Sequence, residues 1–243
     1  MAFKDWGFFP YVAERLAIAD LAAVSFNFSL NGVEGNGNRI TLFANFESNT
    51  ISRELDDLHT VVDAVVSTAI GGDSVDPRRI GLLGHSRGGG LAILHAAADR
   101  RIGALATWSS IATLHRWTQH QKSLWRQCGF LPLAKDTNAS PLRLGIALLE
   151  DIEQHSSEYD IVSAGQRLKI PWLIVHGKTD VAVPVSEAQR LYEIADHAKT
   201  KLLLIDHTGH LYNAANADED HYQTMNAIVA ETTSWFHHQF LQE

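Results

Sequence analysis

The chain has 243 residues, of which 45% are hydrophobic and 20% are charged, and its formal net charge is −8 at neutral pH. This length and composition fit one globular domain with a substantial core. The acidic balance argues against nucleic acids or anionic membranes as partners. A single cysteine, Cys128, excludes an intramolecular disulfide and a cysteine-rich zinc site. We find no signal peptide and no apolar run of bilayer length, and therefore expect a cytoplasmic protein.

Short apolar runs alternate along the chain with longer segments of helical period. This alternation is typical of the α/β class, in which helices cover a mostly parallel sheet. In the first half it predicts a helix at 11–19, a strand at 21–28 (LAAVSFNF), a loop rich in Asn and Gly at 31–50, a helix at 51–69, a strand at 80–83 and a helix at 88–98.

In the second half the pattern predicts strands at 104–108, 171–175 and 201–205, with helices near 186–195 and 222–240. The alternation lapses between these elements, where a helix is predicted at 142–152. We therefore expect a single domain over 1–243 with a helical lid insertion at 110–169, which would form one wall of a pocket. The alternative is a pair of packing helices with no role in substrate choice.

The strongest local motif is the G-x-S-x-G sequence of residues 84–88 (GHSRG), with Ser86 at its centre. The motif requires a strand, a very tight turn and a helix in succession, because the serine must be exposed at the end of the strand. The predicted strand at 80–83 and helix at 88–98 supply these neighbours. A glycine-rich turn with an incidental serine remains the alternative.

A serine hydroxyl needs a base to take its proton, and the base needs a carboxylate to orient it. In this architecture the three groups follow successive strands in the order Ser, Asp or Glu, His. The two later strands run into HGKTD, which ends at Asp180, and into DHTGH, which ends at His210. Both turns would open at the carboxyl edge of the sheet, beside Ser86. The rivals are Asp206 and His207.

We favour His210 over His207 because Gly209 permits a close turn that would direct the ring toward Ser86. His85 is expected to point away from the serine and to pack, and His176 to hold the loop that carries Asp180. The remaining histidines are interpreted as surface or core residues. No ligand cluster accompanies His207 and His210, so the prediction is no metal and no cofactor.

With these residues, the chain resembles the α/β-hydrolase superfamily, on the side of dienelactone hydrolases and prolyl-oligopeptidase-like esterases. The resemblance rests on DPRRI leading into GLLGHSRGGG, on HGKTDVAVP and on HTGH, and residues 3–10 (FKDWGFFP) are similar to the segment after the family's oxyanion-loop strand. It implies a mostly parallel α/β-hydrolase sheet, with Ser86 as nucleophile, Asp180 as acid and His210 as base. The backbone N–H of Arg87 would be one oxyanion donor.

The chain departs from this family at its amino terminus. The family has further strands there, including one that ends in a His-Gly turn and supplies the second oxyanion donor, and this sequence begins after that turn. By analogy, loss of one donor costs about 10²- to 10³-fold in turnover. The absent strand would lie between the strands predicted at 21–28 and 80–83. If strands are missing, an exposed edge of the sheet could pair with a second copy of the chain and form a homodimer.

These observations predict a serine hydrolase of the carboxylesterase type, acting on a small-molecule ester through an acyl-enzyme on Ser86. A thioester or a lactone is also compatible with this chemistry. A peptidase is disfavoured, because peptidases of this resemblance carry an additional propeller domain. The alternative is a non-catalytic homologue that acts as a binding or scaffold protein.

Overall fold

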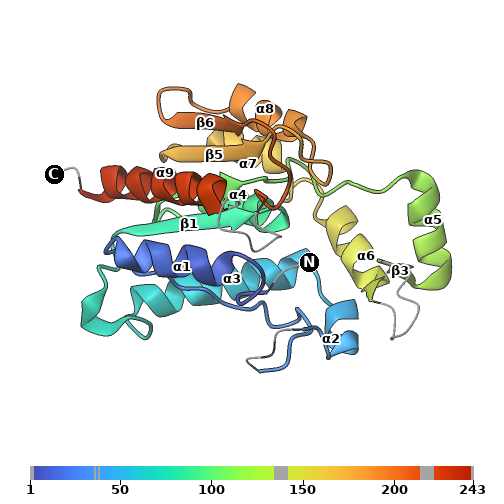
Figure 1. Ribbon diagram of the computed structural model, residues 1–243. Helices are drawn as coiled ribbons and strands as arrows, with labels where there is room; N and C mark the ends of the chain where they lie inside the picture. Colours follow the sequence, from blue (N-terminus) through green and yellow to red (C-terminus); the bar gives the residue numbers. More distant parts are fainter. Residues whose placement is uncertain (1–2, 36, 38, 134–141, 214–221, 242–243) are drawn as a thin grey trace.

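A parallel sheet lies at the centre of the computed structural model, which describes residues 3–35, 37, 39–133, 142–213 and 222–241. Within these ranges the sheet has four strands in the order β1-β2-β5-β6, and each neighbouring pair is parallel (Figure 1). The strands are β1 (Ile80–His85), β2 (Ile102–Trp108), β5 (Trp172–Gly177) and β6 (Thr200–Ile205). The predicted α/β class and parallel sheet are confirmed.

Helices cover both faces of this sheet. Trp172 and Ile174 pack into one core and Leu173 and Val175 into the other, as the two-residue period of a strand dictates. The first core is covered by α3 (Ile51–Val66), α4 (Arg87–Ala98), α7 (Ile161–Arg167) and α8 (Val185–Glu193); the second is covered by α1 (Phe9–Ile18) and α9 (Tyr222–Leu241). None of the described helices is both long and apolar enough to cross a membrane.

Helix α3 confirms the helix predicted at 51–69, although it ends three residues earlier, at Val66. Its amino end is capped by Thr50, whose hydroxyl accepts a hydrogen bond from the Arg53 amide at 3.2 Å. Thr68 has a φ of +61°, a left-handed conformation that an α-helix does not continue. Local backbone geometry therefore stops the helix although the apolar spacing persists.

The strand predicted at 21–28 is wrong. These residues make no sheet pairing and adopt no regular structure. Phe26 and Phe28 still pack against the larger core, while Val24 is exposed. The alternation of apolar residues therefore reflects two partly buried side chains on an irregular segment, because a strand also needs a neighbouring backbone to complete its hydrogen bonds.

The loop predicted at 31–50 is largely irregular, as expected, but it contains a short helix. This helix, α2 (Phe43–Glu47), buries Phe46. An isolated antiparallel bridge joins Val33 to Ile40.

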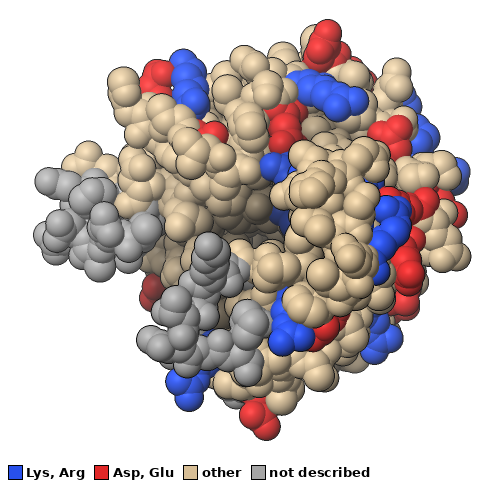
Figure 2. All heavy atoms as spheres, turned by 90° about the vertical axis from the view of Figure 1, so that its right-hand side faces the viewer, with Lys and Arg blue, Asp and Glu red and all other residues tan. Residues whose placement is uncertain are grey.

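Between β2 and β5 the chain forms α5 (Gln119–Cys128), β3 (Phe130–Pro132), β4 (Arg143–Gly145) and α6 (Ile146–Gln154), followed by α7. The helix predicted at 142–152 thus begins at Ile146, because the residues before it pair with β3 as an antiparallel ladder. In Figure 1, α5, β3 and α6 project to the right, beyond the carboxyl end of β1. Seen from that side, the surface is hollowed near its middle (Figure 2).

Candidate active site

Ser86 lies in the turn between β1 and α4, which follow each other without a loop. Its backbone has φ +57° and ψ −122°, and its amide donates to the Trp108 carbonyl at 2.9 Å. A non-glycine residue in such a conformation costs about 1–3 kcal/mol, which the surrounding structure must offset. Gly84 permits the turn, since a Cβ atom there would lie 2.3 Å from the Gly88 carbonyl oxygen. The strand-to-helix turn predicted around Ser86 is therefore present.

His210 and Asp180 meet Ser86 at the carboxyl edge of the sheet. His210 Nε2 lies 3.0 Å from Ser86 Oγ, and His210 Nδ1 lies 2.8 Å from Asp180 Oδ2. The structure thus brings together three residues from the loops after β1, β5 and β6. Gly177 allows the last two loops to touch, because a Cβ atom there would lie 2.2 Å from the Thr208 carbonyl oxygen.

The Asp180 carboxylate is held by the loop that carries it. Its Oδ1 atom accepts hydrogen bonds from the amides of Ala182 at 2.9 Å and Val183 at 2.8 Å, and its side chain is fully buried. Burial acts to raise the pKa of Asp180, but the hydrogen bonds from Val183 and His210 outweigh burial and hold the pKa below its usual range. Asp180 therefore stays ionised beside His210, and its other oxygen is left to orient the imidazole.

The rival residues lie elsewhere. His207 is exposed, and the Asp206 carboxylate is an exposed partner of Lys178, with Nζ at 2.7 Å. Neither contacts Ser86. Of the candidates weighed from sequence, it is His210 that contacts the serine and Asp180 that contacts His210.

His176 holds the loop that carries Asp180, as predicted. Its Nε2 donates to the Val183 carbonyl at 2.8 Å and lies 3.5 Å from Asp180 Oδ2. The ring is fully buried, and burial lowers the pKa of His176, so the neutral form is favoured.

His85 packs against Phe8 and Phe9, as expected for a packing residue, but it also contacts His210. Its Nε2 donates to the His210 carbonyl at 3.0 Å, and the two imidazole rings lie 4.7 Å apart between centroids. Burial lowers the pKa of His85 to about 4, so the ring is neutral and adds no positive charge beside His210.

Arg87 follows the serine, and its guanidinium is held by an acidic residue that the sequence analysis missed. Arg87 Nη2 donates to Glu54 Oε1 at 2.5 Å, and the Asn49 amide donates to the same oxygen at 2.7 Å. Glu54 is almost completely buried, which raises its pKa against the opposing effect of Arg87. The only sequence signal for Glu54 was its place as a polar residue on the buried face of α3. The ion pair with Glu54 fixes the side chain of Arg87, the residue whose backbone N–H is the expected oxyanion donor.

Two further buried hydroxyl groups, also missed, lie behind Asp180. The Ser109 hydroxyl donates to the Tyr212 hydroxyl at 2.9 Å, and the Tyr212 hydroxyl lies 3.3 Å from the Val175 carbonyl, to which it donates. Tyr212 is fully buried, which raises its pKa above the usual range. These contacts tie the loop after β6 to the ends of β2 and β5, and no motif in the sequence indicates them.

Comparison with known families identifies one match. The family model described as the prolyl oligopeptidase family matches residues 32–240. Among curated proteins, none matches the sequence significantly.

Solved structures with similar folds include several hydrolases. The monoacylglycerol lipase of Paleococcus ferrophilus is 16% identical with a TM-score of 0.67, covering 93% of this chain and 88% of the lipase. The α/β hydrolase GrgF of a Penicillium species is 14% identical with a TM-score of 0.72, covering 98% and 86%. Est1E of Butyrivibrio proteoclasticus, solved with ferulic acid, is 19% identical with a TM-score of 0.68, covering 99% and 86%. At these identities the likeness establishes a shared fold.

Proposed function

This chain belongs to the prolyl oligopeptidase family, and we propose that it hydrolyses a small carboxylic ester through an acyl-enzyme on Ser86. The observation that carries the proposal is the hydrogen-bonded series from Ser86 Oγ through His210 to Asp180, at 3.0 and 2.8 Å. A serine, a base and an orienting carboxylate in this order form the catalytic triad of serine hydrolases.

In the first half of the proposed reaction, Ser86 Oγ attacks the ester carbonyl carbon while His210 Nε2 accepts the hydroxyl proton. Asp180 accepts the Nδ1–H of His210, which fixes the tautomer that leaves Nε2 free and stabilises the imidazolium that forms. The negative charge on the carbonyl oxygen would be met by the backbone N–H of Arg87. The C–O bond to the alcohol then breaks, and His210 returns its proton to the leaving alcohol.

In the second half, water attacks the acyl-enzyme and His210 accepts its proton. Collapse of this second tetrahedral intermediate breaks the bond to Ser86 Oγ, releases the carboxylic acid and returns the proton to the serine. A thioester or a lactone can follow the same steps, because each presents an activated carbonyl and a leaving group. The hollow seen in Figure 2, beside the segment between β2 and β5, is the proposed place for the acyl or alcohol group.

The name of one similar structure, a monoacylglycerol lipase, supports an ester rather than a peptide as substrate. A second candidate, a non-catalytic homologue that acts as a binding protein, is disfavoured by the intact contacts between Ser86, His210 and Asp180.

The test is the intact mass of the protein after exposure to a fluorophosphonate probe. Such a probe phosphonylates an activated serine without requiring knowledge of the substrate. We expect one adduct on the parent chain, one on a Ser234→Ala variant, which changes an exposed serine of α9, and none on Ser86→Ala. Absence of an adduct from the parent chain would favour the non-catalytic homologue.

The substrate class is tested next with aryl esters of increasing acyl length, beside a matching thioester and a lactone. Turnover should be lost in Ser86→Ala. Equal turnover in the parent and this variant would remove Ser86 from the mechanism.

A further inference from the structure

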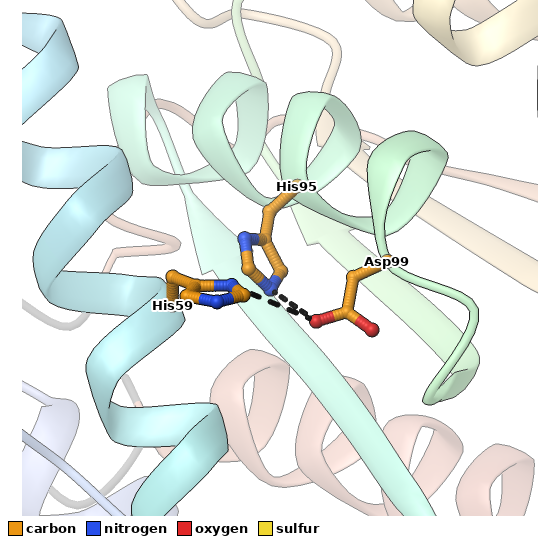
Figure 3. Close-up of side chains that lie close together, drawn as sticks. All are labelled: His59, His95 and Asp99. Atoms are coloured by element: carbon orange, nitrogen blue, oxygen red, sulfur yellow. Dashed lines mark ion pairs between the residues drawn. The ribbon is translucent and has the colours of Figure 1, made fainter.

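A second grouping of histidine and carboxylate side chains lies far along α4 from Ser86. His59 comes from α3, His95 from the last turn of α4, and Asp99 directly follows α4. One donor atom of each residue lies within 4.8 Å of the others. Figure 3 shows the two imidazole rings and the carboxylate directed toward one another across the gap between the helices.

The Nε2 atom of His95 is buried and has Asp99 as an ion-pair neighbour, but the contact lacks hydrogen-bond geometry. His95 is 6% exposed, and its buried Nε2 atom makes no hydrogen bond of good geometry, although Asp99 Oδ2 lies 3.3 Å away. Burial of an unsatisfied polar atom costs about 1–3 kcal/mol, so such atoms are rare in folded proteins. A ligand between His95 and its neighbours would satisfy this nitrogen.

We propose that His59, His95 and Asp99 form a binding site for Zn²⁺. Two imidazole nitrogens and one carboxylate oxygen are a donor set that zinc prefers, with water completing a tetrahedron. Bonds of about 2.0–2.2 Å place tetrahedral ligand atoms about 3.3–3.5 Å apart. The 3.3 Å separation of His95 Nε2 and Asp99 Oδ2 already matches this value.

His59 supplies the adjustable ligand. Its Nδ1 lies 3.9 Å from Asp99 Oδ2, slightly too far for a shared zinc ion, so the ring, which is 57% exposed, would have to move closer to bind it. The opposite ring nitrogen, Nε2, lies 3.6 Å from Asp63 Oδ2. A carboxylate that accepts the second N–H of a ligating histidine is the usual outer partner in zinc sites.

Arg101 orients the carboxylate ligand and also limits the affinity. Its backbone amide donates to Asp99 Oδ1 at 3.0 Å, and its Nε donates to both carboxylate oxygens, at 2.9 Å to Oδ1 and 3.0 Å to Oδ2. Oδ2 is also the oxygen that lies nearest His95 and His59. Arg101 Nη2 lies 2.6 Å from Oδ2, so a metal ion would share this oxygen with a cation. We therefore expect weaker zinc binding than at a structural site closed by four protein ligands.

Zinc at this site would clamp α3 to the carboxyl end of α4. Because a ligand that binds the folded chain alone raises its stability, zinc should raise the melting temperature. The inference is independent of the proposed function, since the site shares no residue with Ser86, His210 or Asp180.

The experiment is a Zn²⁺ titration of the full chain by calorimetry, with Co²⁺ absorption in the visible range as a report of tetrahedral nitrogen and oxygen ligands. We expect one ion per chain and a higher melting temperature with zinc. Affinity should fall about 10-fold or more in His59→Gln and His95→Gln. Because His59 is exposed, the first variant should fold normally even if the second does not.

Two control variants locate the ion. His120→Gln changes an exposed histidine of α5, and His210→Gln removes the proposed base; both should keep the parent affinity. The proposal is overturned if no one-to-one binding occurs, if His59→Gln leaves the affinity unchanged, or if His210→Gln abolishes binding.

Discussion

Helix α4 has a histidine–carboxylate grouping near each end, and the two differ in what holds the carboxylate. At the amino end, Asp180 is held by the neutral amides of Ala182 and Val183 and by His210. At the carboxyl end, the Asp99 carboxylate is held by the Arg101 guanidinium, which lowers the pKa of Asp99 to about 2.

This difference decides what each carboxylate can do. Neutral donors leave the full negative charge of Asp180 available to stabilise an imidazolium, which proton transfer at serine requires. An arginine partner compensates the charge of Asp99, so His95 beside it gains less from protonation. The grouping of Asp180 and His210 therefore suits a general base. The grouping of His59, His95 and Asp99 suits a metal ion, whose positive charge does not have to come from a protonated histidine.

The largest expected effect is loss of the base. His210→Gln keeps a polar side chain but removes the nitrogen that accepts the Ser86 proton. Ester turnover should fall by about 10⁶-fold, the size found when the base of a serine hydrolase is removed. Steady-state kinetics measure the loss, and an unchanged melting temperature would show that the fold is intact. A loss below about tenfold would contradict the assigned role.

The next effect tests the carboxylate that holds the base. Asp180→Asn preserves the shape of the side chain. If its oxygen keeps the hydrogen bonds from the Ala182 and Val183 amides, its NH₂ group takes the place of Oδ2 and directs an N–H toward His210 Nδ1. We expect kcat to fall by about 10⁴-fold with little change in KM, because the wrong imidazole tautomer is stabilised. The matched change Asp99→Asn at the other end of α4 should leave kcat near the parent value, and equal losses in both would refute the distinction between the two groupings.

A pH effect on stability follows from His85. Its folded pKa of about 4 lies below the ordinary value of 6.5, so the unfolded chain binds a proton in this window that the folded chain does not. The free energy of unfolding should therefore fall as pH decreases from 6.5 to 4, by up to about 1.4 kcal/mol per pH unit from this residue. Urea unfolding at several pH values should show a shallower slope in His85→Gln.

Burial also lowers the pKa of His95 and of His176, so part of the slope should remain in that variant. An identical slope in the parent and in His85→Gln would show that His85 is not responsible.

A smaller effect concerns the hydroxyl pair behind Asp180. Tyr212→Phe removes the buried acceptor of the Ser109 hydroxyl and one of two donors to the Val175 carbonyl, which keeps its hydrogen bond from the Ser109 amide at 2.9 Å. The free energy of unfolding should fall by about 1–3 kcal/mol. Since the two hydroxyls contact each other, Ser109→Ala combined with Tyr212→Phe should cost less than the sum of the single changes. Additive losses would show that the pair is not coupled.

The smallest effect is that of His59→Gln on hydrolysis. Without added zinc, kcat and KM should stay at parent values, because His59 lies on α3 and belongs to the grouping at the carboxyl end of α4. A marked fall in kcat would mean that the two ends of α4 are coupled.

Much of the fold follows from local sequence patterns. The parallel strands and most helices were predicted because each carries its own periodicity and turn residues. The segment at 21–28 was not predicted correctly, since Phe26 and Phe28 are spaced as in a strand but are two partly buried side chains of an irregular segment. Hydrogen-bond pairing, which distinguishes the two, depends on a neighbour that the segment itself does not specify.

The sequence by itself determined the α/β class and the placement of Ser86, Asp180 and His210 in loops after successive strands. That order suffices because parallel strands deliver their following loops to one edge. Only the tertiary structure decided that Glu54 supports Arg87 and that His59 meets His95. Such partners lie more than thirty residues apart on separate helices, and helix packing alone sets which side chains face each other.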